Sequence, residues 1–454
     1  MGRPKSPLLA SVLALAMVLL ANLPAGPAGG APRGDSATPC RVKVVVPAVM
    51  REFPEPLPKG RKEPGFALRG TKGWGWTADQ YLAEIPFLAK VRMNFLMNCY
   101  LSMFTDPEKL INRWWEPIPA AKKKAYEKVV RSCREHRISF CFAIHPQLFS
   151  ERPLRYDSEE DFRNLWQHFA WMQGLGVRWF SLSYDDINVE GQDRAKLAEA
   201  QARLVNRVLA RLREKDPKAR LIFCPVYYWG DGSGGDAKAY LGVLARALDP
   251  DVLVFWTGDG VVTRGITVRA AEAYRAAVGH GLVIWDNYPV NDRSGALHLG
   301  PVTGREPGLA KVAYGYMSNP MSPQNETNRI PLSTCADFAW NPWAYDPARS
   351  IGQAVIHLAA KGGQRTALKD LIELYPGNLA CGVPRTDYNC VVEEFNRILS
   401  AGPAAKASAA EFLARVEGVA GRLDREFPDR FADARKTLRD DISRLRARLA
   451  GLPK

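Results

Sequence analysis

From Gly65 to Asn319 the sequence alternates between short apolar runs and longer segments in which apolar residues recur at helical spacing. The runs that we expect to form strands are residues 65–71, 95–100, 138–146, 178–186, 220–228, 252–258, 282–289 and 311–319. Helical patterns lie between them at 118–136, 158–174, 193–214, 237–248 and 267–278. Eight such units predict an α/β fold of the closed (β/α)8 TIM-barrel type, because doubly wound sheets usually contain fewer strands. Segment 293–310 departs from the pattern, since a Gly-rich loop stands where the seventh helix is expected.

The N-terminal end of the chain resembles a targeting segment. Two early cations, Arg3 and Lys5, precede an apolar run from Leu8 to Leu20 and then a series of small residues. This pattern predicts a secretory signal peptide at 1–31, too short to span a bilayer stably. An uncleaved membrane anchor is the alternative. We therefore expect an exported protein, periplasmic or extracellular, without stable membrane insertion after cleavage.

Two further segments flank the expected barrel at 65–345. Residues 32–64 are rich in Pro, Gly and charge, which predicts a linker, with one short strand at the apolar stretch 42–49. Residues 346–454 are predicted to be helical.

Near the C-terminus, apolar residues from Phe412 to Leu449 recur at spacings of three and four. Pro428 is expected to divide this stretch into two amphipathic helices. The spacing is not a clean heptad, which favours a helical region packed on the barrel over a coiled-coil dimerisation arm. The oligomeric state is left open.

The charge pattern limits the classes of partner. Lys and Arg number 62 against 48 Asp and Glu, which gives a formal net charge of +14. The excess is spread along the chain, with no compact basic block and no nucleic-acid motif. We therefore expect no nucleic-acid partner. Anionic glycans or cell-wall polymers remain an alternative class of partner for a basic exported protein.

The cysteines do not suggest a disulfide scaffold or a metal site. Cys99, Cys141 and Cys224 fall in apolar runs, where cysteine usually packs as a small apolar residue. Cys381 and Cys390 could pair in an oxidising compartment. Cysteine and histidine nowhere have the spacing of zinc ligands, so we predict neither a metal nor an organic cofactor.

The fourth expected strand, RWFSLSYDDI, ends in two adjacent acids, Asp185 and Asp186. Catalytic residues of such barrels lie at the carboxyl ends of the strands. Mutual repulsion and partial burial should keep one acid protonated near neutral pH while the other ionises. Ordinary two-carboxylate glycosidases hold their acids about 5 Å or more apart. An adjacent pair better suits a reaction in which the substrate's own 2-acetamido oxygen attacks the anomeric carbon. A solvated turn or a helix cap is the alternative.

Other expected strand ends also carry polar groups. They are Arg69, Gly70 and Lys72 on the first strand, Tyr228 on the fifth, Trp285, Asp286, Asn287, Asn291 and Asp292 on the seventh, and Asn319 on the eighth. Sugars are bound by bidentate polar groups together with an aromatic face, which this set supplies. A purely structural hydroxyl remains an alternative for Tyr228, and Trp256 is more simply explained as barrel core.

Five ordered segments closely resemble glycoside hydrolase family 84, the β-N-acetylglucosaminidases that include the protein O-GlcNAc hydrolases. They are residues 178–187, 223–230, 255–262, 284–292 and 315–321. The resemblance covers roughly residues 65–345. It implies a retaining hydrolase that acts on a glycan or glycoconjugate containing N-acetylglucosamine.

The resemblance also implies roles for individual residues. Asp185 would orient and polarise the acetamido nitrogen, and Asp186 would protonate the leaving oxygen and then activate water against an oxazoline intermediate. The implied sugar-binding residues are Tyr228 for the acetamido group, Asn287 for that group or the acid, Trp285 for the pocket wall, Asp292 for the 4- and 6-hydroxyls, Asn319 for the 3-hydroxyl, and the Gly70 backbone for the same edge.

Two departures from the family pattern concern cations. The family's first strand usually reads EGFYG, whereas residues 69–73 read RGTKG, and a sugar-binding lysine of the second strand is replaced by Leu101. We hypothesise that Lys72 substitutes for that lysine from the neighbouring strand. The departures keep two alternatives open: a glycan-binding barrel with impaired catalysis, and a hydrolase with altered sugar specificity.

Overall fold

The computed structural model describes residues 40–452 except 50, 74, 101, 105–110, 323–324 and 403–404. Two of the sequence predictions concern positions outside the described residues. They are the signal peptide at 1–31 and the replacement of a family lysine by Leu101.

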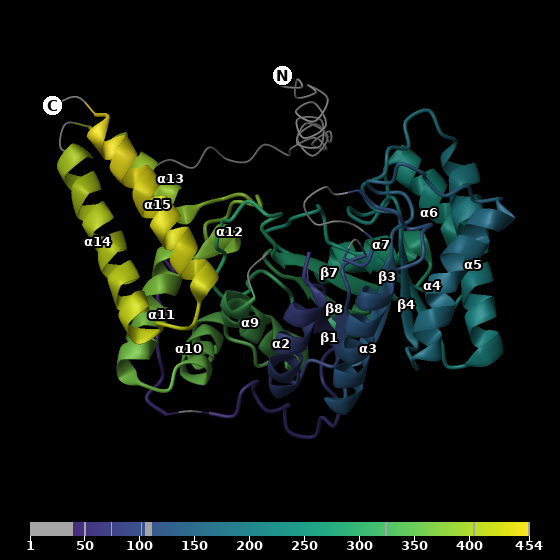
Figure 1. Cartoon of the computed structure of the whole chain (residues 1–454), viewed down its shortest axis with the longest axis horizontal. Helices are drawn as coiled ribbons and strands as arrows, with labels where there is room; N and C mark the ends of the chain where they lie inside the picture. The colour runs from purple at the N-terminus through teal and green to yellow at the C-terminus, as the bar shows by residue number, and fades with distance from the viewer. Residues whose placement is uncertain are drawn as a thin grey trace, which may run out of the picture. The chain divides into compact units, whose positions relative to one another are not determined.

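Parallel strands close into a barrel in chain order, and β8 pairs back onto β1 (Figure 1). The strands are β1 (Leu68–Thr71), β2 (Phe95–Met97), β3 (Ser139–Ile144), β4 (Trp179–Ser183), β5 (Arg220–Cys224), β6 (Leu253–Trp256), β7 (Leu282–Pro289) and β8 (Ala313–Asn319). Each lies within an apolar run of the sequence, so the predicted (β/α)8 fold is confirmed.

Helices follow the strands and cover the outside of the barrel. They are α2 (Ala78–Lys90), α3 (Ala120–Glu135), α4 (Glu159–Gly174), α5 (Arg194–Lys215), α6 (Gly235–Ala247) and α7 (Val268–Val278). Side chains that accept hydrogen bonds from first-turn N–H groups begin four of these helices, namely Thr77, Ser158, Asp193 and Thr267. After β7 only the four-residue helix α8 (Leu309–Val312) forms, in agreement with the Gly-rich segment noted in the sequence.

The side chains of the strands alternate between two apolar cores. The barrel interior contains Met97, Val283 and Met317 among others. The layer between strands and helices contains Phe180 and Leu182. Because successive side chains of a strand point to opposite faces, the parity of a position decides whether its side chain can reach the mouth of the barrel.

The chain after β8 is helical. Its elements are η1 (Glu326–Asn328), α9 (Arg329–Trp340), α10 (Pro347–Leu358), α11 (Gly362–Leu374), α12 (Gly377–Ala380), α13 (Cys390–Leu399), α14 (Ala405–Glu426) and α15 (Ala432–Ala450). Helices α14 and α15 lie side by side, and Pro428 stands between them as predicted (Figure 1). Helix α14 also packs against α11 and α13, as a packed helical region requires. Among the residues that the structure describes, every helix is too short or too polar to cross a membrane.

The short strand predicted at 42–49 is wrong, because residues 41–47 have no regular structure. The Val44 side chain is buried, and its N–H donates a hydrogen bond to Glu373 Oε1 at 3.1 Å. A Cβ on Gly352 would lie 2.1 Å from the Val45 carbonyl oxygen, so a glycine in α10 permits this close approach. The segment therefore packs on the helical region by burial and a side-chain acceptor, without a sheet partner.

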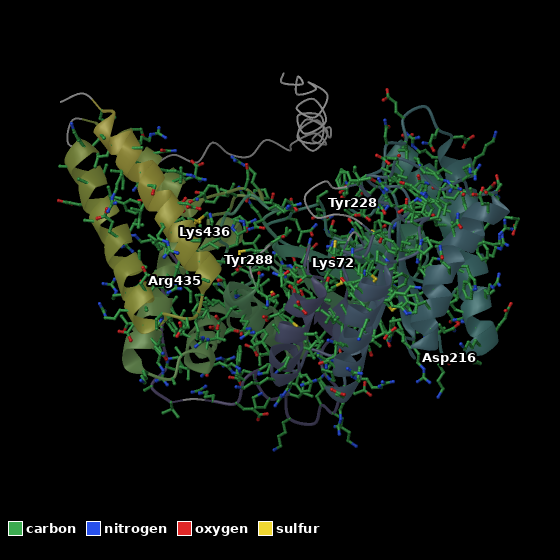
Figure 2. The ribbon with its side chains drawn as sticks, viewed as in Figure 1. Lys72, Asp216, Tyr228, Tyr288, Arg435 and Lys436 are labelled. Carbon is green, nitrogen blue, oxygen red and sulfur yellow. A yellow bond between two sulfur atoms is a disulfide. The ribbon has the colours of Figure 1, made fainter. Side chains whose placement is uncertain are left out.

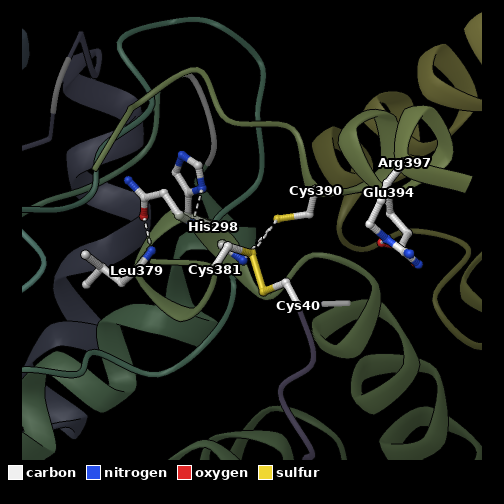
Figure 3. The surroundings of a disulfide bond; sticks show 9 residues. Cys40, His298, Leu379, Cys381, Cys390, Glu394 and Arg397 are labelled. Carbon is white, nitrogen blue, oxygen red and sulfur yellow. Dashed lines mark hydrogen bonds and ion pairs between the residues drawn. A yellow bond between two sulfur atoms is a disulfide. The ribbon is translucent and has the colours of Figure 1, made fainter. Parts of the chain in front are cut away.

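The pairing of Cys381 with Cys390 is also wrong, since Cys381 forms a disulfide with Cys40 (Figure 3). The Cys390 Sγ lies 3.9 Å from the Cys381 Sγ and accepts a hydrogen bond from the Gly377 N–H. The paired cysteines are 341 positions apart, and spacing alone could not indicate them.

Candidate active site

The two adjacent acids directly follow β4. Phe180, Leu182 and Tyr184 of this segment pack in the outer core, so Asp185 has the opposite parity and points into the barrel. Asp186 adopts a left-handed backbone conformation with a φ of 56°. This turn breaks the alternation that would otherwise direct the second carboxyl away from the barrel mouth. Both acids are thus available at one site.

Asp185 is buried, and one of its two carboxylate oxygens accepts a hydrogen bond. The Tyr100 hydroxyl donates to its Oδ2 at 2.7 Å, while its Oδ1 has no hydrogen-bond partner among the described residues. His145 Nδ1 accepts from the Leu148 N–H, so Nε2 carries the proton and donates to the Asp185 carbonyl at 2.8 Å. A buried carboxylate oxygen without a partner is suited to an N–H donor from a bound ligand.

Tyr100 and His145 were not recognised from the sequence. Both lie just after strands, Tyr100 after β2 and His145 after β3, where catalytic residues of barrels are found. Strand-end position was therefore the signal that could have identified them. Their contact with Asp185 depends on the pairing of β2, β3 and β4 in the barrel.

Asp186 has a different environment. The Tyr228 hydroxyl donates to its Oδ1 at 2.7 Å, and the residue is exposed to solvent at the barrel mouth. The surrounding protein and the neighbouring Asp185 charge raise the pKa of Asp186 to about 6, and the Tyr228 hydrogen bond opposes that rise. Roughly a tenth of Asp186 is therefore protonated at pH 7, and about half at pH 6. Tyr228 holds this acid, a role that the sequence resemblance had not implied.

Lys72 lies among these groups. Its Nζ is 3.9 Å from the centre of the Trp285 ring and 4.8 Å from that of Tyr100. Burial lowers the pKa of Lys72, and the charges of Asp185 and Asp292 oppose that shift. Figure 2 shows Lys72 and Tyr228 at the carboxyl ends of the barrel strands, with Asp216 at the opposite end.

Two other polar residues from the strand ends do not reach the site. Arg69 donates from Nη1 to the Phe66 carbonyl at 2.8 Å and from Nε to the Arg92 carbonyl at 3.1 Å. Asp286 forms a buried ion pair with Arg305 at 2.6 Å. Both residues have outward parity, so of the two cations in the altered first strand only Lys72 faces the acids.

A chain of amide hydrogen bonds crosses the seventh and eighth strand ends. Asn319 Nδ2 donates to Asn287 Oδ1 at 2.9 Å, and Asn287 Nδ2 donates to the Val261 carbonyl at 2.7 Å. Within the described part of the chain, the buried Asn319 Oδ1 and Trp285 Nε1 lack hydrogen-bond partners. These two atoms offer an acceptor and a donor to a bound sugar.

Gly70 and Asp292 are the remaining residues that the sequence predicted for the site. A Cβ on Gly70 would lie 1.9 Å from the Phe95 carbonyl oxygen, so the packing of β1 against β2 requires glycine there. Asp292 is exposed in the loop after β7. Its neighbour Asn291 is structural, since its Oδ1 accepts from the Ser322 N–H at 2.8 Å.

The site is built from carboxyl, amide, hydroxyl and aromatic groups. Over the described ranges, no three His, Cys, Asp or Glu side chains gather as they would around a metal ion. Trp256 is fully buried and stacks on Tyr274, consistent with its interpretation as core.

Known proteins share sequence and fold with this chain. Residues 69–373 match the family model of β-N-acetylglucosaminidase. The protein O-GlcNAcases of Rattus norvegicus and Mus musculus are each 28% identical over 279 residues, which is 60% of this chain and 29% of theirs. The chain thus spans less than a third of the length of these curated relatives.

Solved structures share the fold. A mutant of the Thermobaculum terrenum O-GlcNAc hydrolase has a TM-score of 0.68 at 24% identity, covering 85% of this chain and 83% of its own. The structure of CpGH84B has a TM-score of 0.67 at 23% identity, covering 86% of this chain and 68% of its own. Because the family model matches well over half of the sequence, the chain belongs to the β-N-acetylglucosaminidases of glycoside hydrolase family 84.

Proposed function

We propose that this chain is an exported, retaining β-N-acetylglucosaminidase that acts on glycans or glycoconjugates containing N-acetylglucosamine. One observation carries the proposal: two consecutive acids have different environments. Asp185 is buried with one carboxylate oxygen unbonded by any described residue, whereas Asp186 is open to solvent with a pKa near 6. Membership of the family and the names of the relatives support the choice of sugar.

We further propose that the reaction is substrate-assisted. Asp185 Oδ1 accepts the acetamido N–H and turns the acetamido oxygen toward the anomeric carbon. Protonated Asp186 gives its proton to the glycosidic oxygen, the carbon–oxygen bond to the leaving group breaks, and an oxazoline forms. Ionised Asp186 then takes a proton from water as the water oxygen attacks the anomeric carbon, the bond from that carbon to the acetamido oxygen breaks, and the acetamido group is restored. The Tyr100 bond to Asp185 Oδ2 supports this geometry because it keeps Oδ1 facing the substrate.

The pH dependence of hydrolysis tests this proposal. We expect a fluorogenic β-N-acetylglucosaminide to be hydrolysed with a kcat/KM that falls as pH rises through about 6, because Asp186 must carry a proton to act as an acid. Tyr228→Phe removes a hydrogen bond that stabilises ionised Asp186, so the descending limb should move to higher pH. A flat profile up to about pH 9 contradicts the assignment. Sugar binding without turnover would support the alternative of a glycan-binding barrel.

Lys72 is proposed to hold a sugar hydroxyl. Replacing it with methionine keeps the aliphatic contact with the Trp285 and Tyr100 rings and removes the charge. We expect binding to weaken by about 1 to 3 kcal/mol, the usual contribution of a charge-assisted hydrogen bond, and KM to rise accordingly. Lys72→Ala serves as the companion variant. An unchanged KM in both variants rejects the hypothesis that Lys72 takes the place of the family lysine. A gain in kcat/KM for another 2-acylamino sugar would favour the alternative of altered sugar specificity.

Export is proposed from the sequence of residues 1–31 and is supported by the Cys40–Cys381 disulfide, since such bonds persist in oxidising compartments. Cell fractionation and N-terminal sequencing test it. Activity outside the cytoplasm in a chain that has lost its first residues supports export, whereas a cytoplasmic chain that retains Met1 contradicts it.

A further inference from the structure

A cavity of about 380 Å³ lies among α2, α9, α10 and the turn between α14 and α15, all labelled in Figure 1. Its volume falls in the range of small-molecule sites, roughly 300 to 1,000 Å³. The part of α2 that lines it, from Ala83 to Lys90, leads to the amino end of β2. The acids stand at the carboxyl ends of the strands, so this cavity is separate from the candidate active site.

Arg329 is the first of three cationic residues that line the cavity. Its Nε donates to Glu84 Oε2 at 3.0 Å, and its Nη2 donates to Glu84 Oε1 at 2.9 Å. Its Nη1 lies 4.0 Å from Glu326 Oε1, which is beyond hydrogen-bonding distance. Among the residues that the structure describes, Nη1 has no closer acceptor. The guanidinium is thus held in place with donor capacity left over.

Arg430 and Lys90 are the other two cations of the lining. Arg430 Nε donates to Glu326 Oε1 at 2.6 Å, and its Nη1 donates to the Leu358 carbonyl at 3.0 Å. Within the described part of the chain, Arg430 Nη2 has no acceptor, and the exposed Lys90 ammonium has neither a hydrogen bond nor an ion pair. Three separate segments therefore present cationic N–H donors to one cavity.

The cavity carries an excess of positive charge. Over the described contacts, two carboxylates bond to the three cations, namely Glu84 and Glu326, and Glu326 also accepts from the Phe431 N–H at 2.9 Å. His357 lies in the lining too, and burial together with the Lys90 charge lowers the pKa of its imidazole. A bound anion would offset the positive charge that remains.

The rest of the lining is apolar. It is formed by Ala83, Pro86, Phe87 and Leu358. The side chains of Phe87 and Leu358 are buried, and the Arg329 guanidinium carbon lies 5.6 Å from the centre of the Phe87 ring. A ligand that matches this lining has an anionic end and an apolar end.

We propose that this cavity binds a phosphate monoester. One guanidinium can satisfy both oxygens of a carboxylate, whereas a phosphate monoester offers three terminal oxygens and nearly two charges at neutral pH. The phosphate group accepts from Lys90, Arg329 and Arg430. The organic group packs on Phe87 and Leu358. The ligand thereby joins a barrel helix to the helical region that follows β8, and its binding requires no glycosidase activity.

Calorimetric titration of the full chain tests the proposal, with phenyl phosphate as the probe and with inorganic phosphate and benzyl alcohol as separate arms. Phenyl phosphate should bind about 10-fold more tightly than inorganic phosphate, because its ring leaves water for the apolar part of the lining. It should also bind at least about 10-fold more tightly than benzyl alcohol, which has the ring without the charge. Absence of phenyl phosphate binding, or an affinity no greater than that of either other compound, overturns the proposal.

Lys90→Met tests whether the anion binds in this cavity. Methionine keeps an apolar side chain and removes the charge of an exposed residue, so the fold should be retained. Phenyl phosphate should bind about 5-fold to 20-fold more weakly, the expected loss for one charge-assisted hydrogen bond at an exposed position. Lys128→Met is the matched control, since Lys128 is exposed on α3 outside the cavity lining and its replacement changes the net charge equally.

Three results with these variants contradict the proposal. An unchanged affinity in Lys90→Met overturns it, and so do equal losses in Lys90→Met and Lys128→Met, which would indicate general attraction to a basic chain. A loss in Lys72→Met without one in Lys90→Met would place the anion at the active site instead.

The unfolding temperature gives a second measurement. Phenyl phosphate should raise it in the wild-type chain as the ligand concentration rises, and should raise it much less in Lys90→Met. An equal rise in both chains overturns the proposal. Neither calorimetry nor unfolding requires turnover, so a failure of this site leaves the proposed hydrolysis of N-acetylglucosaminides unaffected.

Discussion

Asp186→Asn should lower kcat/KM for a β-N-acetylglucosaminide with a poor leaving group by about 10²-fold to 10⁴-fold, the usual contribution of a general acid. Asparagine has nearly the same shape as aspartate and can still accept the hydrogen bond from Tyr228. It also tolerates the left-handed conformation at this position, where the φ is 56°. The substitution therefore removes the proton donor while retaining the backbone turn.

The dependence of this loss on the leaving group identifies the role of Asp186. A dinitrophenyl aglycone departs without protonation, so Asp186→Asn should affect its release much less than that of a methylumbelliferyl or alkyl aglycone. An equal loss across all aglycones would contradict the acid assignment. Thermal unfolding of the variant at the wild-type temperature is the check that the fold is intact.

Asp185→Asn should lower kcat by about 10²-fold to 10³-fold, as expected when one electrostatic contact to the developing charge is removed. The Tyr100 hydroxyl requires an acceptor and will retain the amide oxygen. The amide NH2 then takes the place of the buried Oδ1, which has no partner in the described part of the chain. A donor in that position faces the acetamido N–H and cannot polarise it.

The two substitutions should differ in how they respond to the aglycone. Asp185 acts on the acetamido group, so its loss should be nearly the same for good and poor leaving groups. Adding Tyr100→Phe to Asp185→Asn tests this reason. Without the Tyr100 hydroxyl the amide can rotate and turn its oxygen toward the acetamido N–H, so part of the activity should return. If the loss of kcat in Asp185→Asn becomes smaller with a better leaving group, Asp185 rather than Asp186 is the acid, and the proposed roles are reversed.

Much of the barrel was predictable because its strands are short apolar runs whose period is local to the sequence. The position of Asp185 and Asp186 at the end of such a run predicted a site there, and the structure brings their carboxyl groups together with Tyr100 and Tyr228. Successive side chains of a strand point to opposite faces, and this alternation would also have separated Lys72, which faces the site, from Arg69, which does not. That distinction requires the register of the strand, which sequence pattern alone gives only within a few residues.

Other features depend on contacts between distant segments. The bond from Tyr100 to Asp185 requires that β2 and β4 flank β3 in a closed barrel. The hydrogen bond from His298 Nε2 to the Thr386 carbonyl joins a barrel loop to the helical region, and no local period indicates it. The stretch 42–49 has the composition of a strand, yet burial of Val44 and a hydrogen bond to Glu373 give it another structure.

The bond between Cys40 and Cys381 determines how the chain responds to proteolysis. Since 341 positions separate the two cysteines, the whole barrel lies inside a covalent ring. A single cut by a protease in any surface loop of this ring opens it without dividing the polypeptide. The cleaved enzyme would therefore migrate as one species without reductant and as two fragments with it, and its barrel strands could remain paired after cleavage.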